Sequence, residues 1–103
     1  MIFIETSIFT KHLPQYMKDE EYRLFQLYLM NNSDKGDIIK GSGGVRKIRW
    51  AINNKGKSGG IRIIYYCKKS ASETWLLTLY AKSEKESIPA HILKQIAQEI
   101  QND

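Results

Sequence analysis

Three cationic side chains occupy alternating positions in two segments that have the residue pattern of neighbouring strands. Lys47 and Arg49 belong to the first segment, and Arg62 belongs to the second. If the segments pair through the glycine-rich turn 53–60, alternation places all three cations on one face. Cations that face one another repel, and a phosphate group bound among them offsets that repulsion. The spacing therefore predicts a phosphate-binding surface, although strand cations often serve solubility alone.

Positive charge is concentrated in the middle of the chain. The sequence has 16 Lys and Arg against 11 Asp and Glu, a net charge of +5. No acid lies between Asp37 and Glu73, and the nine basic residues of that interval are Lys40, Arg46, Lys47, Arg49, Lys55, Lys57, Arg62, Lys68 and Lys69. The other seven basic residues and all eleven acids give the rest of the chain a charge of −4. Such a basic surface attracts a polyanion, and the interleaved aromatic residues Trp50, Tyr65 and Tyr66 favour RNA or DNA over a face that only aids solubility.

Few other side chains offer chemistry. The single cysteine, Cys67, cannot form a disulfide within the chain, and it shares an alternating face with apolar residues, so we expect it in the core. His12 and His91 lie on expected helices, and with one thiol they give no metal-ligand spacing. The Gly-Lys-Ser tripeptide 56–58 is not a phosphate-binding P-loop, because Ala51 stands where that motif needs glycine. We therefore expect no metal and no cofactor.

Two features of the sequence predict a soluble cytoplasmic protein. Residues 1–9 lack the basic region and apolar stretch of a secretory signal. No apolar run approaches the ~20 residues that a membrane span needs. We therefore expect no contact with membranes.

The elements that position these side chains follow from the hydrophobic periodicity. An apolar run at 2–4 predicts a strand, and a helix follows it with Thr6 or Ser7 as N-cap and Pro14 inside it. A second helix runs from 19–21 to 31 or 32, and a loop follows over 31–44, in which Ile38 and Ile39 could form a short strand. Three strands are expected at 45–52, 61–67 and 75–80. The last element is a C-terminal helix with Ser87 as N-cap, Pro89 in its first turn and an apolar stripe of Ile88, Ile92, Ile96 and Ile100.

This element order, β-α-α-β-β-β-α, predicts a small single α+β domain over residues 1–103. Short connections join the three later strands, which favours an antiparallel sheet whose one face is covered by helices. A chain of this length leaves little room for an enclosed cavity. We therefore expect any active site to be a shallow surface.

Three blocks of the sequence carry a resemblance to a known family. They are GGVRKIRW at 43–50, KGKSGGIRIIYY at 55–66, and LYAKSEKE at 79–86 before the last helix. The chain resembles the RelE/ParE superfamily of bacterial toxins over nearly its whole length, and most closely the HigB-type toxins of type II toxin-antitoxin modules. The resemblance implies a RelE-like fold and a ribosome-dependent endoribonuclease that cuts mRNA in the ribosomal A site without a metal. It also implies a neutralising HigA-type antitoxin with a helix-turn-helix domain, through which alone the toxin contacts operator DNA.

The chemistry that this family implies needs no nucleophilic side chain, because the 2′-OH of the mRNA attacks the adjacent phosphate. Lys47 and Arg49 match strand positions where RelE has two lysines. Arg62 matches an arginine that is expected to clamp the scissile phosphate, and Lys82 follows the third strand at a basic position of RelE. These four residues are the predicted catalytic set, with Lys47 as the base. Ser83 stands where RelE has a further arginine.

A second departure lies near Pro89, where RelE has a late tyrosine and this chain has none. HigB-type toxins generally rely on a different set of basic residues, and Lys55, Lys57 and Lys82 are the expected substitutes. The residues expected to bind RNA are Arg46, Lys55, Lys57, Tyr66 and Lys68.

Two other functions are compatible with the sequence. A ParE-like inhibitor of DNA gyrase shares the fold, but ParE relatives tend to lack clustered strand cations. An RNA-binding or ribosome-binding module that makes no cut would use the same basic surface, although no RNP-type or KH-type motif is present.

Overall fold

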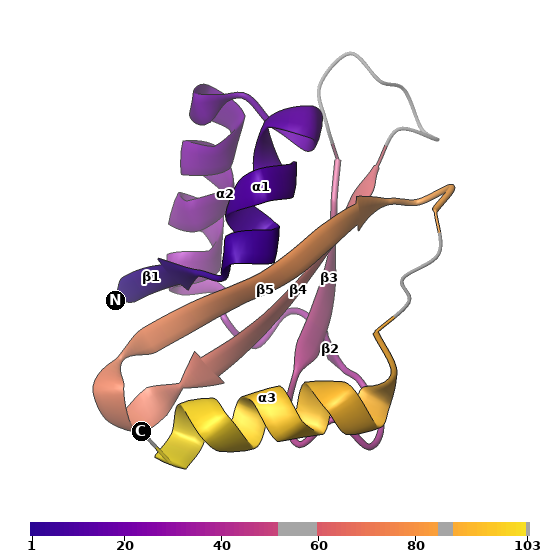
Figure 1. Cartoon of the computed structure of the whole chain (residues 1–103). Helices are drawn as coiled ribbons and strands as arrows, with labels where there is room; N and C mark the ends of the chain where they lie inside the picture. Colours follow the sequence, from indigo (N-terminus) through magenta and orange to yellow (C-terminus); the bar gives the residue numbers. More distant parts are fainter. Residues whose placement is uncertain (52–59, 85–87, 103) are drawn as a thin grey trace.

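The structure is a computed structural model that describes residues 1–51, 60–84 and 88–102. A five-stranded sheet lies between helices (Figure 1). The elements in chain order are β1 (Ile2–Glu5), α1 (Ser7–Tyr16), α2 (Asp19–Asn31), β2 (Asp37–Ile38), β3 (Arg46–Trp50), β4 (Ile61–Lys68), the 3-10 helix η2 (Lys69–Ala71), β5 (Glu73–Ala81) and α3 (Ala90–Asn102). The predicted α+β class is confirmed. None of the helices in these described ranges is long and apolar enough to cross a membrane.

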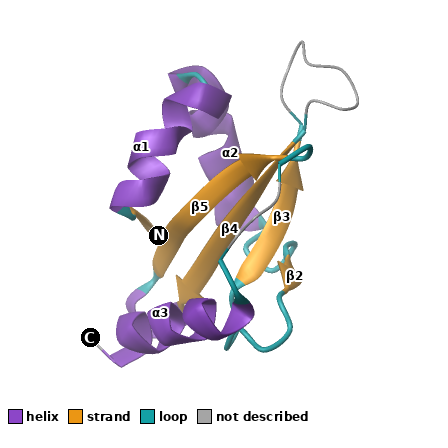
Figure 2. Ribbon diagram, turned by 45° about the vertical axis from the view of Figure 1, so that its right-hand side comes forward, coloured by secondary structure: helices purple, strands orange, loops and turns teal. Residues whose placement is uncertain are grey.

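The sheet has the order β1-β5-β4-β3-β2 and mixes strand directions. β3, β4 and β5 form the predicted antiparallel meander and follow one another across the sheet in Figure 2. β1 instead pairs in parallel with β5, so the prediction of an antiparallel sheet is wrong for this strand. A parallel pair needs a long connection, and the segment between β1 and β5 supplies it with two helices and three strands.

The predicted element order lacks one strand, β2. Its two residues pair antiparallel with β3, Asp37 opposite Lys47 and Ile38 opposite Arg46. Two residues are too few to show an alternating pattern, although the apolar pair Ile38 and Ile39 marks the place. Because of this pairing, the loop that follows α2 runs beside the cations of β3.

The first core lies between the N-terminal helices and one face of the sheet. Thr6 begins α1, where its Oγ1 accepts a hydrogen bond from the Phe9 N–H at 3.1 Å and donates one to the Leu77 carbonyl of β5 at 2.8 Å. On α2, the Phe25 ring packs edge-on against Trp50, with ring centroids 5.2 Å apart. This contact holds α2 beside the end of β3. The buried residues of this core are Phe9, Met17, Phe25, Leu29, Ile48, Ile61, Ile63, Tyr65, Leu76 and Leu79.

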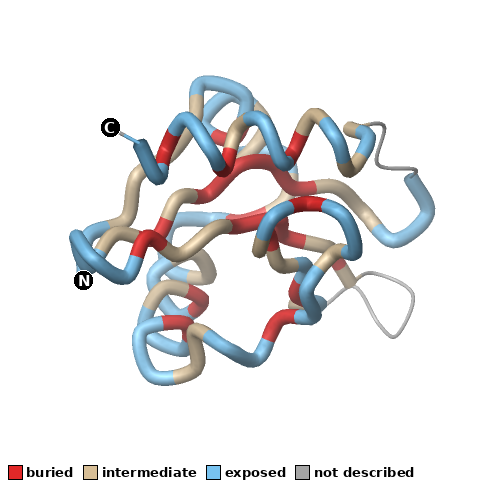
Figure 3. The backbone as a smooth tube through the Cα atoms, turned by 90° about the horizontal axis from the view of Figure 1, so that it is seen from below, coloured by how far each residue is buried: buried red, intermediate tan, exposed pale blue. Residues whose placement is uncertain are grey.

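The second core lies on the other face of the sheet, under α3 (Figure 3). Leu93, Ala97 and Ile100 of α3 are its buried helical residues. Of the predicted isoleucine stripe, Ile100 is therefore buried, and Ile88 and Ile96 pack partly buried against this core. The expectation that helices cover only one face is therefore wrong. Ile63 and Ile64 are consecutive and both buried, so β4 has apolar side chains on both faces and requires cover on both.

Candidate nucleic-acid interface

The register of β3 and β4 brings the predicted strand cations together. Arg49 lies directly opposite Arg62, and Lys47 lies opposite Ile64. These cations alternate with Ile48 and other side chains of the first core, so they occupy the opposite face of the sheet. The prediction that Lys47, Arg49 and Arg62 share one face is confirmed.

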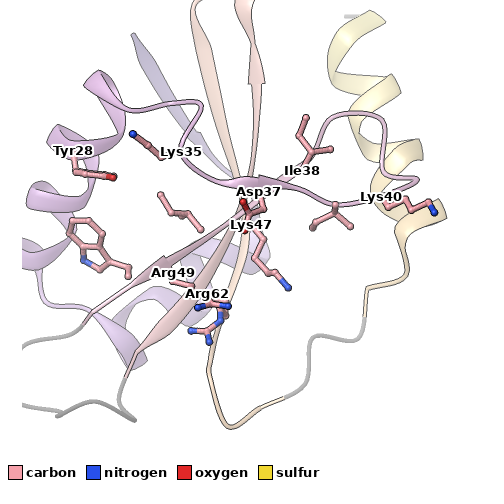
Figure 4. Close-up of a pocket in the computed structure, with 11 residues that line it drawn as sticks. Tyr28, Lys35, Asp37, Ile38, Lys40, Lys47, Arg49 and Arg62 are labelled. Carbon is pink, nitrogen blue, oxygen red and sulfur yellow. The ribbon is translucent and has the colours of Figure 1, made fainter.

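A hollow of about 900 Å³ runs along the edge of β3 and is named the basic groove here. Its lining residues are Tyr28, Lys35, Asp37, Ile38, Ile39, Lys40, Lys47, Ile48, Arg49, Trp50 and Arg62. In Figure 4, Tyr28 and Lys35 lie toward the α2 end of the hollow, and Ile38 and Lys40 lie toward the other end. Five cations and one carboxylate, that of Asp37, line the groove, so its field is strongly positive.

Lys82 lies beside a second hollow that adjoins the basic groove. This hollow has a volume of about 360 Å³ and shares Arg49, Trp50 and Arg62 with the groove. The Lys82 backbone N–H donates to the Gly60 carbonyl at 3.0 Å, which ties the start of the segment after β5 to the start of β4. The structure thus places all four residues of the predicted catalytic set around two connected depressions.

None of these four side chains forms an ion pair with a carboxylate of the described part of the chain. The salt bridges there join Asp34 to Arg46 at 3.6 Å and to Lys69 at 3.8 Å, away from the groove. Arg62 makes one long hydrogen bond, from Nη1 to the Ile61 carbonyl at 3.5 Å. A guanidinium has five N–H donors. Most of the donors of Arg62 are therefore available to a ligand.

Arg46, which was expected to bind RNA, is committed to the protein instead. Its Nη1 donates to the carbonyls of Asp34 at 3.1 Å and Gly36 at 2.7 Å, and its side chain is 22% exposed. Alternation along β3 puts it on the face opposite to that of Lys47. Arg46 therefore fixes the loop after α2, and through it β2, rather than lining the groove.

Tyr66 and Lys68, which were also expected to bind RNA, do not line the basic groove. The Tyr66 hydroxyl donates to Gln101 Oε1 at 3.1 Å, and its ring packs on the second core. Lys68 is only 8% exposed. Lys55 and Lys57 lie outside the described residues.

The wall contributed by α2 and β2 was not predicted as part of a site. Tyr28 appears in the sequence as one more apolar residue of a helix, and Lys35 and Asp37 lie in a segment without periodicity. Trp50, expected in the core, is partly buried against Phe25 and also contacts Tyr28, with ring centroids 5.4 Å apart. The signal for this wall in the sequence was the pair of cations, Lys35 and Lys40, on the two sides of β2.

The cysteine and the two histidines, Cys67, His12 and His91, do not line the basic groove. Cys67 is partly buried against the first core, as expected, and burial raises the pKa of its thiol. His12 and His91 lie on α1 and α3, as predicted. Across residues 1–51, 60–84 and 88–102, no three His, Cys, Asp or Glu side chains group to hold a metal ion.

No protein-family model matches the chain. The resemblance to RelE/ParE toxins therefore rests on the sequence blocks 43–50, 55–66 and 79–86, and it stays a prediction.

Proposed function

We propose that this chain is the toxin of a type II toxin-antitoxin module, of the HigB type within the RelE/ParE superfamily. It acts in the cytoplasm as a ribosome-dependent mRNA endoribonuclease. One observation carries the proposal: Lys47, Arg49, Arg62 and Lys82 line two adjoining hollows, and no carboxylate of the described residues pairs with them. A concentration of unpaired cations on an open surface suits a polyphosphate chain better than a small neutral substrate.

The proposed reaction uses the mRNA as its own nucleophile. The 2′-oxygen attacks the adjacent phosphorus while its proton passes to a base, the bond from phosphorus to the 5′-oxygen breaks, and that oxygen takes up a proton. The products are a 2′,3′-cyclic phosphate and a 5′-hydroxyl. The protein therefore has to supply a base, an acid and positive charge for the transition state.

The four cations divide these roles by position. Arg62 binds the scissile phosphate through paired guanidinium N–H donors, and Arg49, opposite it in the register, adds charge as negative charge builds on the phosphate oxygens. Lys47, which lies two residues before Arg49 on the same face of β3, accepts the proton of the 2′-OH. Lys82, in the adjoining hollow, donates a proton to the leaving 5′-oxygen.

The partners in this proposal follow from the resemblance. They are the ribosomal A site with its mRNA, and a HigA-type antitoxin with a helix-turn-helix domain. Operator DNA is bound only through that antitoxin.

The test is primer extension on a defined mRNA in a translation extract, with and without ribosomes. It compares the wild type with Arg62→Ala and with Lys11→Ala, which removes an exposed cation from α1. We expect ribosome-dependent cuts from the wild type and Lys11→Ala, and a loss of at least about 10-fold for Arg62→Ala, since hydrogen bonds to charged groups contribute about 1.5–3 kcal/mol. Melting temperatures of the three proteins control for folding.

Other outcomes identify the alternative functions. Arrested translation without new 5′ ends indicates a ribosome-binding or RNA-binding module that makes no cut. Continued translation together with DNA breaks in expressing cells indicates a ParE-like gyrase inhibitor.

A further inference from the structure

The basic groove is lined by exposed aromatic and apolar side chains as well as by cations. Tyr28 of α2 is 37% exposed and Ile38 of β2 is 59% exposed. Both line the same hollow as Lys47, Arg49 and Arg62. Exposed apolar side chains and cations thus line a single depression, with Tyr28 and Ile38 toward its two ends and Lys47, Arg49 and Arg62 between them (Figure 4).

The Tyr28 ring is held in place by contacts that lead into the core. It lies 5.4 Å from the Trp50 ring, measured between centroids, at an interplanar angle of 52°. Trp50 packs edge-on against Phe25, which is fully buried, at 5.2 Å and 76°. A tyrosine supported in this way keeps its orientation at little further cost in conformational entropy when a ligand binds.

An exposed aromatic ring beside a row of cations is the combination that binds single-stranded nucleic acid. Bases stack on the ring, and the backbone phosphates contact the cations. The volume of about 900 Å³ lies within the range of roughly 300–1,000 Å³ that small-ligand sites occupy. The hollow is therefore large enough for a base on one wall and a phosphate on the floor.

We propose that the basic groove binds single-stranded RNA with one nucleobase stacked on Tyr28 and the neighbouring phosphates on Lys47, Arg49 and Arg62. The identification of the ligand as RNA rests on the proposed function. Because every base presents an aromatic face, Tyr28 contributes affinity and position, and it does not select the base.

Tyr28 also covers Trp50, and a purely structural role has to be separated from stacking. Tyr28→Leu keeps an apolar side chain over Trp50 but removes the aromatic face, whereas Tyr28→Phe keeps that face. Leu24→Ala is the matched control, because Leu24 is 54% exposed on the same helix and does not line the groove.

The experiment measures binding of a fluorescently labelled five-nucleotide RNA to the full chain by anisotropy at fixed salt. Stacking contributes about 1–3 kcal/mol per base, so we expect Tyr28→Leu to weaken binding by about 5- to 150-fold. Tyr28→Phe and Leu24→Ala should stay within about twofold of the wild type. For an abasic ribose-phosphate oligomer of the same length, Tyr28→Leu should bind as the wild type does, since only the phosphate contacts remain.

A second measurement does not depend on how the Tyr28 variants fold. The chain has 2 tryptophans, so Trp75→Phe leaves Trp50 as the only one. Addition of the RNA should then quench the Trp50 emission, because the stacked base adjoins the ring that Trp50 contacts. The abasic oligomer should quench it far less.

Three results would overturn the inference: no binding of the RNA by the wild type, equal affinity of Tyr28→Leu and wild type, or equal quenching by the RNA and the abasic oligomer. Failure of the proposed function is a different result. In that case Tyr28-dependent RNA binding persists, but no mRNA is cut in the translation extract.

Discussion

The pairing of Arg49 with Arg62 across β3 and β4 should lower the stability of the unliganded protein. Like charges directly opposite one another in an antiparallel pair destabilise it by an amount comparable to other cross-strand pairs, about 0.2–1 kcal/mol. No carboxylate of the described residues forms an ion pair with either arginine. We therefore expect Arg49→Gln to raise the free energy of unfolding by about 0.2–1 kcal/mol. For a domain of this size the melting temperature should rise by roughly 1–8 °C.

Two controls separate this pair from a general effect of net charge. Arg49→Gln changes the net charge from +5 to +4, and Lys11→Gln on α1 makes the same change away from the groove. Lys11→Gln should leave the free energy of unfolding within about 0.5 kcal/mol of the wild type. The screening length falls from about 10 Å at 0.1 M salt to about 3 Å at 1 M. The gain from Arg49→Gln should therefore be largest at low salt and shrink at 1 M.

The assay is urea denaturation of the three proteins at 20 mM and 1 M sodium chloride. A loss of stability in Arg49→Gln would refute the reasoning, and so would a gain that 1 M salt leaves unchanged. Either result would mean that the two guanidinium groups do not repel each other across the register. The groove would then not hold the unneutralised charge on which phosphate binding depends.

Two further predictions concern the scaffold. In Gly36→Ala the new Cβ would lie 2.7 Å from the hydroxyl oxygen of Tyr65, which accepts from the Gly36 N–H at 3.1 Å, so urea denaturation should show a loss of about 1–3 kcal/mol. In the matched Gly60→Ala the Cβ meets no atom of the described residues closer than 3.6 Å, so the stability should change by less than about 0.5 kcal/mol. Equal effects of the two substitutions would contradict the steric argument. Burial and the hydrogen bond that Tyr22 donates to Glu5 at 2.7 Å raise the pKa of the Tyr22 hydroxyl above its ordinary value of 10.0. The contribution of this hydroxyl to the free energy of unfolding is therefore complete below pH 10 and is lost as the pH rises further. Between pH 9 and about 12 the free energy of unfolding should decline less steeply in Tyr22→Phe than in the wild type, and parallel curves would refute this prediction.

The cationic face was predictable because it depends on local periodicity. Lys47, Arg49 and Arg62 occupy alternate positions of two strands joined by a short connection, so their shared face follows from the two-residue repeat of a strand. The same local rules predicted Thr6 or Ser7 as the N-cap of α1, and Thr6 is the residue that caps it.

The pairing of β1 was not predictable from local pattern, because it depends on which distant strand offers an unpaired edge. β5 does so, after a crossover of two helices and three strands. The position of α3 does not follow from local pattern either. The consecutive Ile63 and Ile64 are the one local signal for it, because both are buried and β4 therefore needs cover on both faces of the sheet.

Contacts between distant parts of the chain also decide that Tyr28 lines the basic groove and that Arg46 does not. Tyr28 reaches the groove because Phe25 positions α2 against Trp50, a contact between residues far apart in sequence. Arg46 differs from its neighbour Lys47 only by one step of alternation, which turns it toward the carbonyls of the loop after α2. Charge counting along the sequence treats these two side chains alike, and only the fold separates them.

The most direct test of the central proposal, that the basic groove promotes attack by the 2′-OH of mRNA, uses two mRNAs that differ in one atom. Primer extension in a translation extract first locates a cut, and the second mRNA then carries a 2′-deoxy nucleotide on the 5′ side of that bond. We expect the cut to vanish at this bond and to persist at other positions of the same mRNA. A cut that survives the loss of the 2′-OH would contradict the proposed chemistry.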